Sequence, residues 1–197
     1  MASTGPRTKD TTTVTLGFAQ VRMGASAGNI ATTDIALTTS DSIGALANTK
    51  FTSEVDWFRL ESGYPLMKDA SFPLREVAKM ECAFKEITPA NLAWARGLDA
   101  SSGYTEEHSG EIELGNMTTP EFVRMEAVYT YPDGTNALNI IFPRAQVESG
   151  IELDFQGEDN VASPLVIEAN TADSTLSSGG SDVWDDRPLG RVYWTKT

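Results

Sequence analysis

Cysteine and histidine are almost absent from this chain, which contains one of each, Cys82 and His108. A single cysteine rules out an internal disulfide, and one cysteine with one histidine provides no credible set of zinc or copper ligands. Cys82 lies on the apolar side of an alternating stretch, so we interpret it as a small buried hydrophobe. His108 lies in a polar, loop-like stretch, where we expect a solvated side chain. Nothing in the sequence brings the two together, as cysteine–histidine catalysis requires.

Long apolar runs are also missing, because no stretch approaches the roughly 20 residues that a membrane-spanning helix needs. The first residues, MASTGPRTKDTTT, have no apolar segment behind their charges and do not match a secretory signal. We therefore expect a protein that is made in a cytosol and does not bind membranes.

Basic residues are scarce: 15 Lys and Arg stand against 28 Asp and Glu, for a formal net charge of −13. Binding of duplex nucleic acid through its phosphates requires clustered Lys and Arg, and the sequence contains no such cluster. An acidic surface instead keeps a protein soluble and repels polyanions.

Catalytic signatures are absent too, since no GxSxG, P-loop, HExxH or GxGxxG pattern occurs. The acidic clusters at 106–107, 154–159 and 182–186 lack the alternating spacing of a calcium-binding loop. We interpret them as solvated loops and predict no enzyme activity, no metal and no cofactor. Trp184 and Trp194 leave open a sugar-stacking platform, although packing of exposed or interface tryptophans is more common.

The sequence does contain many segments with residue patterns typical of β-strands. We predict a mainly β fold, either an antiparallel β-sandwich or a partly open barrel, with one short flanking α-helix. The length suits a single domain at 13–197, preceded by a flexible N-terminal arm at 1–12. Eight or nine strands are expected. The candidates are 14–23, 31–39, 51–61, 74–86, 122–131, 137–142, 151–156, 164–169 and 191–195, with a possible short strand at 111–114. Residues 41–50 fit either a loop or one helical turn.

The stretch 72–98 has the clearest secondary-structure pattern in the sequence. Ala78, Met80, Cys82 and Phe84 alternate with polar residues, as in a half-buried strand. A short helix follows, because Thr88 is a good N-cap, Pro89 suits the first helical position and Gly97 can end the helix. So short a helix must be stabilised by packing. We expect four apolar side chains to pack together and hold the helix on the strand, and we call them the core brace. They are Met80, Phe84, Leu92 and Trp94.

A second strand pair is expected at 122–131 and 137–142, joined by the turn signal Pro132-Asp133-Gly134. Its apolar face holds alternate residues from Val123 to Tyr129. Between the strands at 51–61 and 74–86, Gly63 and Pro65 predict an exposed loop at 62–71.

Five features in order carry a resemblance to a known family. They are the segments SEVDWFRLE, SGYPL, REVAKMECAFKEITPANLAWARGL, AVYTYPDGTNALNIIFPRA and PLVIEAN. In this order and spacing, across about residues 51–170, the chain resembles the tail tube (major tail) proteins of long-tailed bacteriophages. The helix segment resembles the family pattern E-[IV]-T-x-x-N-L-A-x-A-x-G-L, FPRA resembles its F-P-[KR]-A element, and PLVIEA resembles its closing P-L-x-[FI]-E-A strand.

The resemblance implies a β-sandwich or barrel with a flanking helix, six of which form a ring. Rings would stack into a hollow tube that conducts the genome, with two hairpins per subunit building one continuous inner barrel. The implied partners are other copies of the chain, together with tape-measure, tail-terminator and baseplate or tip proteins. DNA would pass without specific binding. The implied location is the virion tail, assembled in the cytoplasm of the host bacterium.

On this hypothesis the polar strand faces line the lumen. The candidate lumen-facing residues are Lys79, Glu81, Lys85, Arg124, Glu126 and Thr130. An ordinary solvent-exposed sheet face explains the same pattern. A net-acidic wall would let DNA slide, and the basic members of this set would pair with Glu81 and Glu126 across strands.

Stacking of rings requires a segment that reaches the next ring, and the 62–71 loop is the first candidate. The candidate inter-ring residues are Ser62, Gly63, Tyr64, Pro65, Leu66, Met67, Lys68 and Asp69. The N-terminal arm and residues 41–50 are second choices. The main alternative function is a β-sandwich binding module on a phage particle, which recognises carbohydrate or a host surface.

Overall fold

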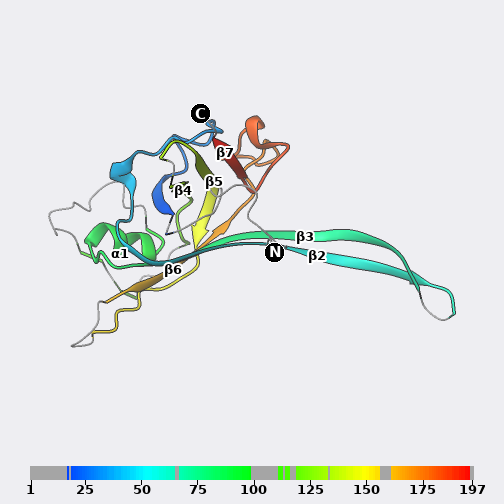
Figure 1. The fold of residues 1–197 in the computed structure, drawn as a ribbon, viewed down its shortest axis with the longest axis horizontal. Coiled ribbons are helices and arrows are strands. Elements are labelled where there is room, and N and C mark those ends of the chain that lie inside the picture. The colour runs from blue at the N-terminus through cyan, green and yellow to red at the C-terminus, as the bar shows by residue number, and fades with distance from the viewer. Residues whose placement is uncertain are drawn as a thin grey trace, which may run out of the picture.

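The computed structural model describes residues 17, 19–64, 67–98, 111–112, 114–115, 119–132, 134–155 and 161–195. Within these residues the chain is mainly β, with seven strands in one antiparallel sheet and one short α-helix, which confirms the predicted fold class (Figure 1). The sheet is open and does not close into a barrel. The predicted N-terminal arm at 1–12 lies outside the described residues.

The strands are β1 (Gln20–Ala25), β2 (Leu46–Ser62), β3 (Met67–Phe84), β4 (Val123–Thr130), β5 (Ala137–Val147), β6 (Ser163–Ala169) and β7 (Arg191–Thr195). The α-helix is α1 (Pro89–Ala95), and two 3-10 helices span Thr39–Asp41 and Asp182–Trp184. The strand order is β1-β4-β5-β6-β3-β2, and β7 pairs with β5 off this path.

The sheet curls around one core. Its two halves, β1-β4-β5 and β6-β3-β2, both contribute side chains to a single buried cluster. The two outer strands meet near the start of β2, where the Ile43 N–H donates to the Val21 carbonyl at 3.0 Å. The alternation predicted for the inner part of β3 is present, since Ala78, Met80, Cys82 and Phe84 are all buried while Lys79 and Glu81 are not.

Helix α1 covers the end of this core. The Thr88 side chain accepts a hydrogen bond from the Asn91 N–H at 3.2 Å, and Pro89 opens the helix. At the other end Gly97 adopts φ = +76°, and the Leu98 N–H returns to the Ala93 carbonyl at 2.9 Å. Such a positive φ suits a residue without Cβ, so the glycine ends the helix at this point.

The expected brace residues gather at one place. Met80, Phe84 and Trp94 belong to the main buried cluster, and Leu92 packs at its margin. The helix has only seven residues, so this packing rather than intrinsic helix propensity stabilises it.

A second, smaller cluster lies on the opposite face of the β4–β5 pair. It is built from Ile141, Ala172 and Trp184, with Ile30 and Ile35 packed against it. The segment 29–37, hereafter the covering loop, lies over this face. The sequence predicts a strand at 31–39, and this prediction is wrong, because the segment forms no strand.

Four other segments differ from expectation. Residues 151–155 form no strand, and neither do 111 and 112 within the partly described 111–114. The first strand begins at Gln20 rather than Val14, although 14–16 and 18 lie outside the described residues. Residues 41–50 divide between the end of a 3-10 helix and the start of β2.

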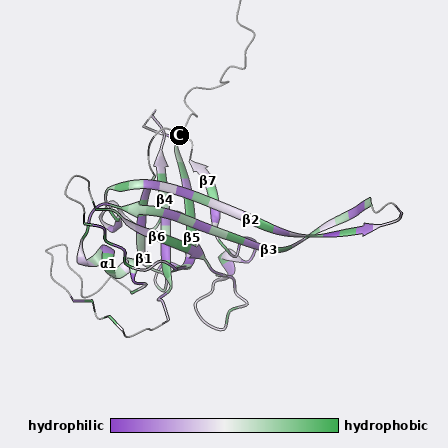
Figure 2. Cartoon of the chain, turned by 90° about the horizontal axis from the view of Figure 1, so that it is seen from below, coloured by the Kyte–Doolittle hydropathy of each residue, from purple (hydrophilic) through white to green (hydrophobic). Residues whose placement is uncertain are grey.

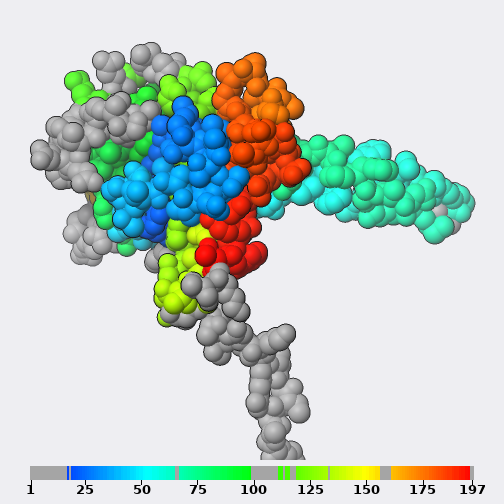
Figure 3. All heavy atoms as spheres, turned by 90° about the horizontal axis from the view of Figure 1, so that it is seen from above, coloured from blue at the N-terminus to red at the C-terminus, as the bar shows by residue number. Residues whose placement is uncertain are grey.

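The largest difference is the β2–β3 hairpin. The predicted loop at 62–71 is wrong as a loop, because β2 continues to Ser62 and β3 starts at Met67. Gly63, at φ = +87°, makes a turn tight enough to reverse the chain there. The outer part of the hairpin projects far from the body of the molecule (Figures 1 and 3).

Candidate interaction surfaces

The face of β2, β3 and β6 that points away from the core carries a row of ion pairs. The Lys79 Nζ lies 2.5 Å from a Glu168 carboxylate oxygen and 3.5 Å from one of Glu148. Arg75 also approaches Glu168, at 3.8 Å. The strand register explains the first pair, because Lys79 and Glu168 are direct cross-strand partners. A second register pair, Lys50 and Glu81, lies 3.3 Å apart.

These contacts shift the pKa values of Lys79 and Glu168. The hydrogen bond from Lys79, and then the nearby positive charges of Lys79 and Arg75, hold the pKa of Glu168 below its ordinary value against the effect of desolvation. In turn, the hydrogen bond to Glu168 raises the pKa of Lys79. The lysine is therefore matched by carboxylates within its own chain rather than being a free cation.

Arg124 and Glu126 form a different kind of pair, because both side chains are 0% exposed. They lie two residues apart on the same face of β4, with Arg124 Nε 2.6 Å from Glu126 Oε1. The guanidinium also donates to the Asn29, Thr32 and Asp34 carbonyls at 2.6–2.8 Å.

The carboxylate completes the arrangement. Glu126 accepts hydrogen bonds from two backbone N–H groups of the covering loop, those of Ala36 at 2.8 Å and Leu37 at 3.0 Å. The pair thus supplies the hydrogen bonds that a neighbouring strand would otherwise give this segment, and it holds the covering loop on the sheet.

The six predicted lumen residues therefore separate into two groups. Lys79, Glu81, Lys85 and Thr130 have at least part of their surface exposed. The expectation that Arg124 and Glu126 point into open space is wrong, because the covering loop buries both. A lumen role for the other four stays a prediction.

The outer part of the hairpin, residues 57–74, is hereafter the distal hairpin. Polar and apolar residues follow one another along both of its strands (Figure 2). Its large apolar side chains are exposed in the isolated chain: Trp57 by 55%, Phe58 by 50%, Phe72 by 51% and Tyr64 completely. The other exposed members are Leu60, Met67 and Leu74. Of the predicted inter-ring residues, Ser62–Tyr64 and Met67–Asp69 are described and lie at its tip, while Pro65 and Leu66 fall outside the described residues.

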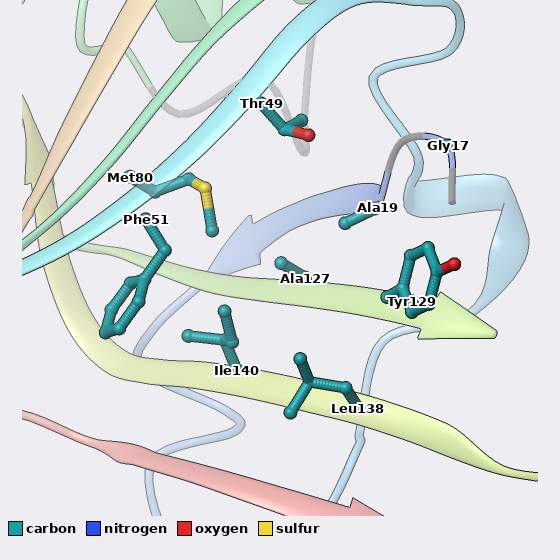
Figure 4. Close-up of a pocket in the computed structure, with 9 residues that line it drawn as sticks. All are labelled: Gly17, Ala19, Thr49, Phe51, Met80, Ala127, Tyr129, Leu138 and Ile140. Atoms are coloured by element: carbon teal, nitrogen blue, oxygen red, sulfur yellow. The ribbon is translucent and has the colours of Figure 1, made fainter. Parts of the chain in front are cut away.

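Near the base of the hairpin the structure contains an apolar pocket of about 310 Å³ (Figure 4). Phe51 and Met80 line it from the β2–β3 side, and Ala127, Tyr129, Leu138 and Ile140 line it from β4 and β5. Gly17, Ala19 and Thr49 complete the lining. Its polar groups are too few to suggest catalysis, so we treat it as a contact surface.

The possible sugar platform does not form, because Trp184 is buried and donates its indole N–H to the Ile30 carbonyl at 2.6 Å. Trp194 is exposed on β7 and donates its indole N–H to the Tyr131 hydroxyl at 3.2 Å. In the part of the chain that the structure describes, no three His, Cys, Asp or Glu side chains are placed to hold a metal ion. Among the same residues, no helix combines the length and apolar character that crossing a bilayer requires.

Neither the scan against protein-family models nor the search of curated proteins finds a match to this chain. The surfaces of the molecule itself are therefore the basis for inferring its function.

Sequence reasoning missed the apolar pocket and the length of the distal hairpin. The pocket is lined from five separate segments of the chain, and no local pattern signals it. The hairpin left a signal in the aromatic residues on both sides of Gly63, which are costly to expose unless they contact something.

Proposed function

We propose that this chain is a structural subunit of a long-tailed bacteriophage, which associates with copies of itself into rings that stack as the hollow tail tube. The observation that carries the proposal is the distal hairpin, which extends large apolar side chains away from the body that could have buried them. Such a feature fits a contact with another molecule better than it fits an isolated domain.

The amount of exposed apolar surface agrees with a protein contact. An aromatic side chain offers about 150–250 Å². Four of the seven exposed side chains of the distal hairpin are aromatic, and with their partial exposure and the three smaller apolar side chains the segment presents on the order of 1,000 Å². A standard protein interface buries about 800 Å² on each partner. The distal hairpin alone is therefore large enough to form a specific contact.

A second feature supports association side by side. Among the described strands, β2 pairs only with β3, so one edge of this 17-residue strand has no partner. Long free edges invite pairing with another chain, and closing strands into a ring removes them. The proposal assigns this edge to the contact between neighbours in a ring.

The exposed charged face fits passage of DNA. A free lysine on the wall would hold phosphates, but Lys79 is already matched by Glu168 and Glu148. With a net charge of −13 on the chain, such a wall repels DNA rather than binding it. We accordingly propose Lys79, Glu81, Lys85 and Thr130 as lumen-facing residues.

On this proposal the chain has no catalytic role and needs no cofactor. Its partners are other copies of itself, with tape-measure, tail-terminator and baseplate or tip proteins at the ends or inside the tube. It assembles in the host cytoplasm and resides in the virion tail.

Shortening the hairpin tests the proposal. Asp56 and Arg75 are direct cross-strand partners, so a two-residue Asn-Gly turn can join them in place of residues 57–74. No residue of 57–74 belongs to either buried cluster, so we expect a folded monomer that forms no tubes. Circular dichroism reports the fold, and sedimentation velocity reports assembly.

The matched control keeps the hairpin length and its apolar side chains but carries Arg59→Gln with Glu61→Gln. This variant should assemble as the wild type does. Tubes formed by the shortened chain would contradict the proposed role of the distal hairpin.

A further inference from the structure

The apolar pocket lies where the two outer strands of the sheet separate. At one end these edges are joined by the Ile43–Val21 hydrogen bond of 3.0 Å and by a bridge between Arg22 and Ser42. Toward Ala19 on one side and Phe51 on the other they part, and the apolar pocket opens between them (Figure 4). Its volume of about 310 Å³ lies at the lower end of the range of ~300–1,000 Å³ for binding pockets.

The chain's own distal hairpin does not fill this pocket. Phe51 of β2 forms part of the pocket wall, and from there β2 runs outward, away from the body (Figure 1). Thirteen residues separate Phe51 from Tyr64, which at about 3.3 Å per residue places the tip roughly 40 Å away. The distal hairpin of a second copy can approach the pocket from outside, so this distance does not prevent it from entering.

Charge also favours the distal hairpin as the occupant. Residues 57–74 contain Arg59 and Lys68 against Glu61 and Asp69, so this segment is neutral and the rest of the chain carries the full −13. Two copies repel each other over most of their surfaces, and the neutral tip is the part that approaches a second copy with the least repulsion.

We propose that the apolar pocket of one copy receives the hairpin tip of the next, with Tyr64 and Met67 as the inserted side chains. The inference rests on the proposed function and names the receiving site for its stacking contact. Tyr64 is completely exposed and Met67 is 65% exposed, while the pocket presents Phe51, Leu138 and Ile140 to them. An aromatic anchor in a pocket is the usual centre of a strong protein contact.

The contact is heterologous, because the tip and the pocket are different surfaces of the same chain. A heterologous contact closes into a ring only when its rotation closes, and otherwise it repeats from copy to copy. Between stacked rings each copy is displaced along the tube axis, so the proposed contact repeats. Each step would advance by about the distance from Phe51 in the pocket wall to Tyr64 at the tip, roughly 40 Å.

Paired cysteines test this contact. Met67→Cys at the tip combined with Leu138→Cys in the pocket should give, under mild oxidation at high protein concentration, a ladder of disulfide-linked oligomers on non-reducing gels. Each single variant should give dimers at most. Cys82 does not interfere, because it is buried and desolvation raises its pKa to about 12.

The matched control pairs Met67→Cys with Asp182→Cys, an exposed position outside the pocket lining, and should form no ladder. As a second measurement, Tyr64→Ala should weaken self-association at least about tenfold, as loss of an anchor does. A ladder in the control, or none in the test pair, overturns the inference. If the wild type still forms tubes while the test pair gives no ladder, the proposed function stands and only the receiving site is wrong.

Discussion

Arg124 and Glu126 show how one pair of residues can organise a whole segment. Five hydrogen bonds join the pair to backbone groups of the covering loop, and no part of either side chain is exposed. A buried ion pair is a poor source of net stability when intact, but removal of one partner leaves a buried charge without compensation.

Glu126→Ala should therefore lower the free energy of unfolding by about 3–5 kcal/mol, because Arg124 and two backbone N–H groups lose their acceptor. Urea denaturation followed by tryptophan fluorescence measures this loss. The control is Glu81→Ala, which breaks an exposed pair and should cost less than about 1 kcal/mol. Equal losses in the two variants would contradict the role given to the buried pair.

The Lys79–Glu168 pair makes stability depend on pH. The pKa of Glu168 is lowered in the folded state, so its contribution is present above the unfolded value of about 4.3 and is lost as pH falls through the folded pKa. The pKa of Lys79 is raised, so its contribution is present below about 10.4 and is lost as pH rises through the folded pKa.

Glu168→Gln should accordingly destabilise the protein at pH 7, and the difference from wild type should shrink as the pH is lowered below 4. Chemical denaturation at several pH values measures it, with Glu148→Gln as a control that removes only the longer contact to Lys79. A difference that persists unchanged at pH 2 would rule out the ion pair as its source.

At the scale of elements, the parts predicted correctly from sequence are those whose pattern directly reflects burial. Inner β3 alternates because one of its faces packs on the core. The limits of α1 follow from Thr88, Pro89 and Gly97, whose effects are local to the backbone. Both the strand and the helix could therefore be predicted without knowledge of the rest of the fold.

The errors arise where a distant segment decides the outcome. Arg124 and Glu126 alternate with apolar residues as in a solvent-facing strand, and only the fold shows that the covering loop lies over them. Ile35 and Leu37 alternate as in a strand, yet the Leu37 N–H bonds to the Glu126 carboxylate rather than to another strand. Neither of these contacts between distant segments can be predicted from residue spacing in the sequence.

The distal hairpin differs from the sequence prediction for another reason. Gly63 and Pro65 indicate a turn, and because the faces of the flanking strands are not cleanly separated, the sequence predicts a long loop there. The structure shows irregular register between Asp56 and Trp57 and again between Leu60 and Glu61. Each irregularity shifts by one residue the alternation of side chains between the two faces of the hairpin. The sequence therefore does not show the regular period-2 pattern by which a strand is predicted.

At the scale of the molecule, three features support the proposed self-association. The body has a complete core, the distal hairpin leaves apolar side chains uncovered, and the apolar pocket lies open at its base. A net charge of −13 keeps separate copies apart at low salt, since the repulsion is screened only as ionic strength rises. The assembly that we propose would then depend on specific contacts rather than on general attraction.

We propose that this chain assembles into hollow rings and tubes, and electron microscopy of the purified wild-type protein at high concentration can show whether it does. We expect end-on views with a central hole and side views with a repeat of roughly 40 Å, set by the distance from Phe51 to the hairpin tip at Tyr64. Particles that stay monodisperse monomers at every concentration and salt, or that form solid fibres without a hole, would contradict the claim.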